Sequence, residues 1–329
     1  MQSGYVSYTF SMQHNSSEQE DELRQSLRII ESAFDTNKLI ARKAGDTGLV
    51  AKYYRRNKLA YKLVHSKDGF VHMGISRDSI FKTDDFYEQG RIVQAYIDDM
   101  HPVKVLELAA GKAATTRYLA ARNPNVHFHG MDLPHGQLDV NTKLPANLTL
   151  GFGDYHDLRD IPSNSVDIVY IIEALCHANN RRQVIAEVFR VLKPGGRFIV
   201  FDGYTAKPRN AMTDIERYAS DLTFASMMVA TSDLYYGNFK DELVKEHLTF
   251  EKEEDLSQYV LPSMKRLEPD SARFLKHSHI TRLATKLLSS MLTATAIAGV
   301  LMPITTEMGI HQYWLTVARK ASLQKRRSI

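Results

Sequence analysis

Residues 103–121 constrain the fold of this chain more than any other stretch, because a strand, a turn and a helix follow one another there without a break. The apolar run 103–108 predicts a buried strand, and the small residues of 109–113 predict a tight turn. Thr115 and Thr116 are suitable caps for the helix that comes next. Backbone N–H groups converge at such a turn, and missing side chains let a ligand come close. The stretch therefore predicts a nucleotide-type pocket.

Strands and helices continue to alternate after this unit. Apolar runs at 126–131, 166–172 and 197–201 predict three more strands, and 313–318 predicts a last strand at the edge of the sheet. Buried apolar strands separated by helices are typical of parallel sheets covered on both faces. The pattern therefore predicts an α/β fold with a doubly wound, mostly parallel sheet.

Two helical regions flank this predicted core, which comprises residues 101–203 and 309–329. Residues 1–100 predict a helical N-terminal cap, and residues 204–308 predict a helical insertion over the carboxyl ends of the strands. Within the insertion, residues 287–306 carry no charge and are long enough for a membrane span. Their serines, threonines and one proline instead favour a buried helix that lines an apolar pocket.

Composition narrows the class of protein further. A chain of 329 residues with 43% hydrophobic residues can bury one large core, and a net charge of +4 is too small to predict a nucleic-acid partner. The single cysteine, Cys176, excludes an internal disulfide and fits a reducing compartment. The first fifteen residues lack the basic start and apolar run of a secretory signal. We therefore expect a cytoplasmic protein without a membrane span.

The turn does not have the G-x-G-x-x-G spacing of a dinucleotide site. Its pattern, Glu107-x-Ala109-x-Gly111-x-Ala113, resembles motif I of the class I S-adenosylmethionine-dependent methyltransferases, with alanine at two glycine positions. Asp132, then Gly153-Asp154, then the turn 193–196 follow in the order of that family's pattern. The resemblance implies a Rossmann-like sheet and S-adenosyl-L-methionine as the cofactor. It assigns cofactor binding to Glu107, Ala109, Gly111, Asp132, Leu133, Gly153, Asp154 and Tyr155.

A second resemblance points to one subgroup of this methyltransferase family. The segment 170–178, YIIEALCHA, resembles the Y-x-I-E-A-x-C-H-A signature of sterol and terpenoid C-methyltransferases. Tyr53-Tyr54 and the segment 71–74 resemble the substrate entrance shared by tocopherol, sterol and prenyl diphosphate methyltransferases. The resemblance to the subgroup covers residues 50–205 and implies that an alkene attacks the sulfonium methyl group. The N-terminal cap would then contribute to the substrate entrance.

That reaction produces a carbocation that must lose a proton, so it needs a dry apolar pocket, aromatic faces and a carboxylate base. Glu173 ends a predicted strand and is the predicted base, although it would also suit a hydrogen bond to a helix terminus or to a ligand hydroxyl. Tyr53 and Tyr54 are predicted to shield the cation. His177 is predicted to orient Glu173 or relay its proton, with a core histidine as the equal alternative.

The basic residues at 52–62 indicate which chemical group the acceptor carries at its polar end. Lys52, Arg55 and Arg56 share a helical face, which suits a diphosphate, whereas a solvated basic face is the alternative. By the same resemblance, Asn57 and Glu88 are candidate ligands for a Mg²⁺ ion on the diphosphate. His72 and Tyr204 complete the predicted substrate-binding residues.

The sequence therefore predicts a terpenoid-biosynthesis enzyme that methylates an alkene carbon of geranyl or farnesyl diphosphate, with cyclisation of the cation left open. Two alternatives stay open. One is a sterol, quinol-lipid or other small-molecule C-, O- or N-methyltransferase, and the other is a non-enzymatic cofactor-binding protein. The sequence leaves the oligomeric state open, a homodimer included.

Overall fold

A seven-stranded sheet forms the centre of the computed structural model, which describes residues 16–41, 47–60, 65–134, 136–141, 143–229, 234–276, 281 and 290–321. The strands are β1 (Lys104–Leu108), β2 (His127–Asp132), β3 (Leu148–Phe152), β4 (Val166–Ile172), β5 (Leu192–Thr205), β6 (Leu248–Asp255) and β7 (His311–Lys320). The longer helices are α1 (Ser16–Ala33), α3 (Thr47–Ala60), α4 (Glu88–Met100), α5 (Ala114–Arg122), α6 (Arg181–Val191), α7 (Asp214–Met227), α8 (Tyr236–Lys245), α9 (Ser257–Lys265), α10 (Glu268–Lys276) and α12 (Ser290–Glu307). Shorter helical segments are α2 (Thr36–Ile40), η2 (Thr83–Tyr87), η3 (Leu175–His177) and η4 (Arg209–Ala211).

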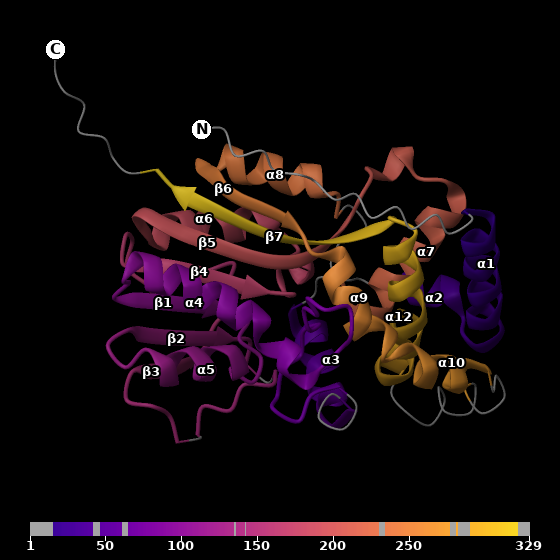
Figure 1. Cartoon of the computed structure of the whole chain (residues 1–329), viewed down its shortest axis with the longest axis horizontal. Coiled ribbons are helices and arrows are strands. Elements are labelled where there is room, and N and C mark those ends of the chain that lie inside the picture. The colour runs from indigo at the N-terminus through magenta and orange to yellow at the C-terminus, as the bar shows by residue number, and fades with distance from the viewer. Residues whose placement is uncertain are drawn as a thin grey trace, which may run out of the picture.

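The strand order is β3-β2-β1-β4-β5-β7-β6 (Figure 1). The pairs from β3 to β5 are parallel, whereas β7 runs antiparallel to both β5 and β6. The chain order reverses between β1 and β4, so the carboxyl ends of these two strands flank a topological switch point where α/β sheets bind ligands. The predicted fold class, a doubly wound and mostly parallel α/β sheet, is confirmed.

Three features of the sheet differ from the sequence prediction. β7 lies between β5 and β6 instead of at the edge, β3 was not predicted, and β6 falls within the insertion expected to be helical. β6 is the edge strand, and most of its side chains are exposed or half-buried. Its charged residues suit an edge exposed to water. Because of them, the segment lacks the alternation of apolar and polar residues by which a strand is recognised. Residues 248–255 therefore belong to the sheet.

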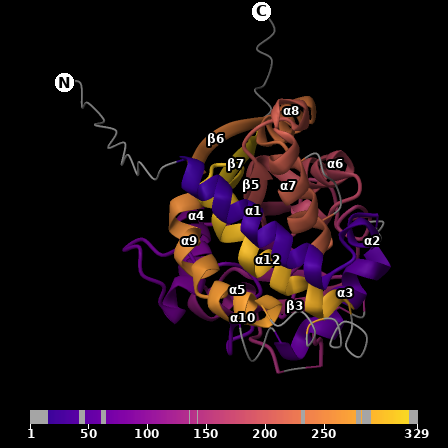
Figure 2. The same cartoon turned by 90° about the vertical axis from the view of Figure 1, so that its right-hand side faces the viewer.

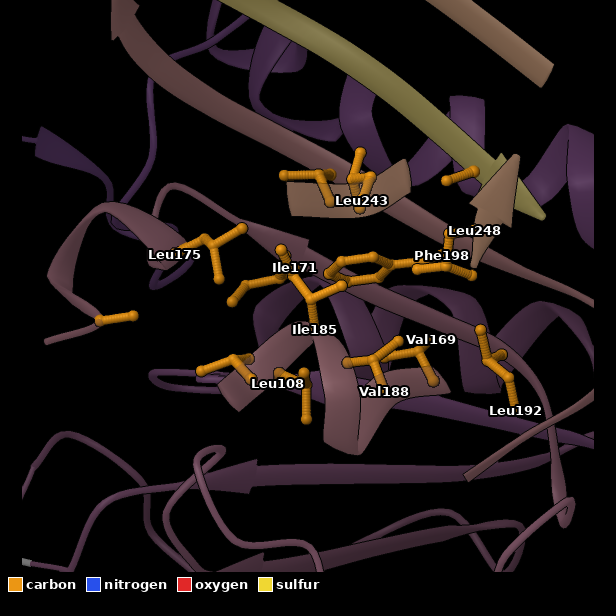
Figure 3. Packing of buried hydrophobic residues seen from close by; sticks show 14 of the residues in the cluster. Leu108, Val169, Ile171, Leu175, Ile185, Val188, Leu192, Phe198, Leu243 and Leu248 are labelled. Carbon is orange, nitrogen blue, oxygen red and sulfur yellow. The ribbon is translucent and has the colours of Figure 1, made fainter. Parts of the chain in front are cut away.

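Apolar side chains on both faces of the sheet form the core. On one face, Leu108, Val169 and Phe198 from the strands pack against Ile185 and Val188 of α6, as Figure 3 shows. On the other face, α4, α5 and α9 cover the same strands. Because the strands are buried on both faces, their sequences are continuous apolar runs. The core thereby fixes the strand ends at which polar side chains gather.

The helical part of the molecule lies beyond the carboxyl ends of the strands. α1, α7, α10 and α12 pack around a separate apolar cluster, and Figure 2 shows α1 lying across α12. α12 occupies most of the uncharged segment 287–306 and is packed inside the protein. Among the described residues, no helix is long and apolar enough to cross a membrane. The prediction of a buried helix here is confirmed.

Gly299 lets α12 approach α10 closely, and replacing it with alanine is expected to destabilise the protein. A Cβ at this position would lie 2.8 Å from the Cβ of Ser271 and would overlap its Oγ. We expect a loss of about 1–3 kcal/mol in the free energy of unfolding, as for other overpacked sites. Urea denaturation measures it. Adding Ser271→Gly, which removes both overlapping atoms, should restore part of the loss, and unchanged stability of Gly299→Ala would contradict this packing.

Candidate active site

Two adjoining cavities open at the carboxyl ends of β1, β4 and β5. The larger, of about 500 Å³, extends from the end of the sheet to α7, α10 and α12. The smaller, of about 60 Å³, lies over the turn after β1 and the end of β2. Tyr54, Val71, Glu173 and His177 line both cavities and form the boundary between them. A reacting group at this boundary would be reached from both sides.

The turn after β1 is built from residues in the left-handed backbone conformation. Gly111 has φ of 58°, which glycine adopts freely, but Ala109 and Ala113 have φ of 53° and 58°. The two alanines therefore hold a conformation that is strained for residues with a Cβ, as is common at functional sites. Ala113 is the N-cap of α5, so Thr115 and Thr116 lie inside the helix and the prediction that they cap it is wrong.

Asp132 ties this turn to the end of β2. Its Oδ2 accepts a hydrogen bond from the Gly111 N–H at 2.5 Å, and its Oδ1 accepts one from the Leu133 N–H at 2.7 Å. Burial raises the pKa of Asp132 to about 6, and the two N–H donors oppose the shift. The carboxylate is therefore charged above pH 6 and lies in the wall of the smaller cavity. This geometry suits a ligand with hydroxyl donors.

Most of the predicted cofactor residues meet at the smaller cavity. Those that line it are Ala109, Gly111, Asp132, Leu133, Gly153 and Tyr155. Glu107 and Asp154 are not among the lining residues. Glu107 is buried and accepts a hydrogen bond from the hydroxyl of Thr116, and burial raises its pKa to about 8. Asp154 accepts from the backbone N–H of His156 at 2.9 Å and bonds its Nδ1 at 2.6 Å.

Gln137 is a lining residue that the sequence reasoning missed. Its side chain is 3% exposed, and within the described residues neither its Nε2 nor its Oε1 has a hydrogen-bond partner. A buried amide without partners is costly, and a ligand with both donors and acceptors would satisfy it. The residues of the smaller cavity therefore fit a nucleoside-type cofactor. Gln137 lies in the loop that follows the strand-end residue Asp132, next to Gly136. This position in the sequence could have identified it.

Glu173 stands at the end of β4 in a left-handed conformation, with φ of 48°. Its Oε1 accepts hydrogen bonds from the Met73 N–H at 2.8 Å and the Tyr313 hydroxyl at 2.9 Å. Burial raises its pKa to about 8, so the carboxyl is largely protonated at neutral pH without a ligand. A cation bound beside it would lower that pKa and make it a base.

His177 bonds to Tyr54 and not to Glu173. Its Nδ1 lies 3.0 Å from the carbonyl oxygen of Met228, which only accepts, so Nδ1 carries the proton. Burial lowers the pKa of His177, and the neutral ring therefore accepts the Tyr54 hydroxyl hydrogen at Nε2, 2.9 Å away. In the structure His177 therefore holds Tyr54 and does not orient Glu173 as predicted. The ring of Tyr54 also packs edge-on against Tyr53.

The predicted substrate residues separate into two groups. Tyr204 lines the larger cavity, as does Tyr53, which is predicted to shield the cation. His72 does not line it: the Nδ1 of its buried ring donates to the Met73 carbonyl oxygen at 3.0 Å, and burial lowers its pKa to about 4. Lys52 is half-buried and Arg55 exposed, and neither lines a cavity. The side chains of Arg56 and Asn57 lie outside the described residues.

The predicted metal ligand Glu88 pairs with two arginines instead. Its carboxylate lies 3.6 Å from Arg77 and 3.3 Å from Arg91. Across the described part of the chain, no group of three or more His, Cys, Asp or Glu side chains is arranged to hold a metal ion. The described lining of the larger cavity contains no lysine or arginine, whereas Glu173, Asp202 and Asp270 line it. The cavity wall is thus apolar with acidic groups.

Replacing Asp132 with asparagine is expected to lower the affinity for S-adenosylhomocysteine by about 10- to 100-fold, because a hydrogen bond to a charged group contributes about 1.5–3 kcal/mol. Calorimetry with S-adenosylhomocysteine measures it. Asp157→Asn, on a carboxylate paired with Arg159 outside the cavity lining, is the control. Asp154→Asn should lose less than Asp132→Asn, and the reverse order would place the main acidic contact at Asp154.

Comparisons with known proteins agree with this geometry. The model of the family described as "Methyltransferase domain" matches residues 106–200. Sterol 24-C-methyltransferase erg-4 of Neurospora crassa is 35% identical over 106 residues, which are 30% of this chain and 27% of that protein. The matched part is thus a small share of that relative's length.

Solved structures share the fold over most of the chain. The cyclopropane synthase MmaA2 of Mycobacterium tuberculosis aligns with a TM-score of 0.66 at 11% identity, covering 84% of this chain and 99% of that one. A geranyl diphosphate methyltransferase in complex with GPP and sinefungin aligns with a TM-score of 0.61 at 14% identity, covering 84% and 99%. Residues 106–200 thus carry a methyltransferase domain, which lies in a doubly wound sheet with a strand-end cavity suited to S-adenosylmethionine.

Proposed function

We propose that the protein transfers a methyl group from S-adenosylmethionine to an alkene carbon of a sterol- or terpenoid-type acceptor. The observation that carries the proposal is the position of Glu173, at the boundary between the cofactor cleft and a larger apolar cavity. A carboxyl group at this boundary is within reach of a carbon methylated there. The sterol methyltransferase relative supports the same class of acceptor.

The chain's own residues would supply binding, shielding and proton removal. The cofactor, when bound, provides a methyl group on a positively charged sulfur. Asp132 and Gln137 would hold its polar parts in the cleft, while the apolar cavity wall excludes water. The acceptor's double bond would lie beside Tyr53 and Tyr54, whose ring faces stabilise positive charge. Glu173 would then accept the proton that restores the double bond.

The cavity favours an acceptor that is long and largely uncharged. Its lining on α12 runs from Thr293 to Thr306, which at 1.5 Å per residue corresponds to about 20 Å of helix. A diphosphate carries several negative charges, and the described lining offers it no basic side chain. These features favour a sterol or neutral terpenoid as the acceptor.

A prenyl diphosphate such as geranyl or farnesyl diphosphate is the second candidate, as the sequence predicts. A structural neighbour that holds GPP supports it, and so do the basic residues of α3 (47–60), the helix that also carries Tyr53 and Tyr54. Lys52 and Arg55 would have to turn toward the ligand from outside the cavity lining.

An acceptor panel tests the proposal. The protein would be incubated with S-adenosylmethionine and a sterol with a side-chain double bond, a neutral prenyl alcohol, or geranyl or farnesyl diphosphate, each with and without Mg²⁺. We expect methylated sterol or alcohol that does not depend on Mg²⁺. Product only from the diphosphates, and only with Mg²⁺, would select the second candidate. Cofactor binding with no C-methylated product from any acceptor would contradict C-methylation.

A further inference from the structure

We propose that Asp202 and Tyr204 on β5 form, together with Glu173, a binding site for a positively charged centre carried by an apolar ligand. The inference deepens the proposed function and rests on it, because the charged centre of the reaction is the cation formed on the acceptor. It assigns a role to a carboxylate that the methyl transfer described above does not use. The site would also bind stable cations with apolar tails.

The sheet places the two carboxylates on neighbouring strands. β4 and β5 are parallel, and Ile172 pairs with Phe201. Glu173 and Asp202 are the next residues on their strands, so they lie at the same level of the sheet. The Glu173 N–H donates to the Phe201 carbonyl oxygen at 2.7 Å, which joins the two strand ends. Both residues line the larger cavity. Two carboxylates therefore flank one end of a largely apolar space.

Tyr204 provides an independent sign that a ligand belongs at this end of the cavity. It stands two residues after Asp202 in the strand, a spacing that places both side chains on one face of the sheet. Its side chain is 2% exposed, and within the described residues its hydroxyl has no hydrogen-bond partner. The ring stacks on Phe239 and lines the cavity. An aromatic ring and an unpartnered hydroxyl oxygen both favour a cation.

The charged groups around the cavity favour a ligand with a positive charge. Asp202 accepts hydrogen bonds from the Cys176 N–H at 2.9 Å and the Gly203 N–H at 2.8 Å, which stabilise its charged form. Arg181, which also favours that charge, is already bound to Glu242 by hydrogen bonds at 2.5 and 3.0 Å. No lysine or arginine lies in the described cavity lining. A cation entering the cavity therefore meets the negative charge of Asp202, which no lysine or arginine of the described lining neutralises.

Binding of simple amphiphiles tests this without any turnover. The full-length protein would be titrated with dodecyltrimethylammonium, 1-dodecanol and dodecanoate, which share a twelve-carbon chain and differ in the sign of their charge, all below their micelle concentrations. We expect the cation to bind at least about tenfold more tightly than the alcohol, and the anion most weakly. Equal affinity for the cation and the alcohol would overturn the proposal.

Substitution separates the charge of Asp202 from its structural hydrogen bonds. Asp202→Asn keeps an acceptor oxygen, and we expect it to lose most of the preference for the cation while its affinity for dodecanol stays within about twofold. Asp167→Asn is the matched control, because Asp167 also accepts two backbone N–H groups, at 3.0 and 2.9 Å, but does not line the cavity. Unchanged cation preference in Asp202→Asn would assign Asp202 a purely structural role.

The pH dependence of wild-type binding keeps the test valid if Asp202→Asn does not fold. Burial raises the pKa of Asp202 to about 6 and that of Glu173 to about 8. The titratable or charged groups that face them are Cys176 and His177 of η3, Arg181 of α6, Tyr204 of β5, Tyr313 of β7 and Tyr155 after β3. Dodecyltrimethylammonium should therefore bind more weakly as the pH falls through about 8, where Glu173 is protonated, and more weakly still as it falls through about 6, whereas dodecanol should not.

Activity measurements distinguish a failure of this inference from a failure of the proposed function. Because the charge on Asp202 raises the pKa of Glu173, Asp202→Asn should move the acidic limb of kcat/KM to lower pH. Methylation with an unmoved limb would refute the role of Asp202 and leave the methyl transfer intact. Selective cation binding without any methylated product would support the cation site and refute the methyl transfer.

Discussion

Replacing Glu173 with glutamine is expected to lower the rate at which the methylated alkene forms by about 10²- to 10⁴-fold, the range over which a positioned base accelerates a reaction. Glutamine has the same shape and keeps an oxygen that accepts from the Met73 N–H and the Tyr313 hydroxyl. The cofactor cleft should therefore stay intact. Single-turnover assays measure the loss, and calorimetry should show affinity for S-adenosylhomocysteine within about twofold of the wild type.

The control for this variant is Glu187→Gln. Glu187 accepts from the Leu158 N–H at 2.7 Å and pairs with Arg190, and it lines neither cavity. Its substitution should leave turnover unchanged. Full activity in Glu173→Gln would remove Glu173 from the mechanism. Loss of both activity and cofactor affinity would show that the carboxyl group mainly shapes the cleft.

Replacing Ala296 with phenylalanine is expected to lower turnover of a long acceptor by about 10²-fold, because a displaced reacting group loses that much in rate. Ala296 is half-buried on α12 and lines the larger cavity but not the cofactor cleft. The larger ring would occupy space that the acceptor's chain needs. Cofactor affinity should not change, so the loss should appear in the acceptor's kcat/KM alone.

Ala296→Ser is the matched control, since it nearly preserves the volume of the side chain at the same position on α12. An acceptor shortened by one or two isoprene units should recover much of its turnover in Ala296→Phe, because its chain would end before the added ring. Wild-type turnover of the long acceptor by Ala296→Phe would show that the acceptor does not extend along α12.

The cofactor cleft was the most predictable part of the site, because it is local in sequence. A strand, a small-residue turn and a helix are consecutive, and Asp132 follows the next apolar run directly. Six of the eight residues assigned from the resemblance do line the cleft. Glu107 and Asp154 do not, because their carboxylates are bonded to Thr116 and His156, and contacts of this kind depend on how neighbouring elements pack.

The acceptor side was less predictable, because residues far apart in the chain build it. The spacing of Lys52, Arg55 and Arg56 indicates a shared helical face but does not say which way that face points. In the structure Tyr53 and Tyr54 line the cavity, whereas Lys52 and Arg55 do not. Asp202 follows the apolar run 197–201 just as Asp132 follows its own strand, so the same reasoning applied to β5 would have identified it.

The sequence by itself determined the parallel sheet, the turn after β1 and the carboxylates at the ends of β2 and β4, because these depend on local periodicity and on residues adjacent to apolar runs. Only the tertiary structure decided that Lys52 and Arg55 lie outside the cavity lining, that His177 holds Tyr54, and that β6 completes the sheet. Each of these is a contact between elements distant in the chain. Such contacts arise when separate apolar faces are buried together, and no short pattern of residues records which faces will meet.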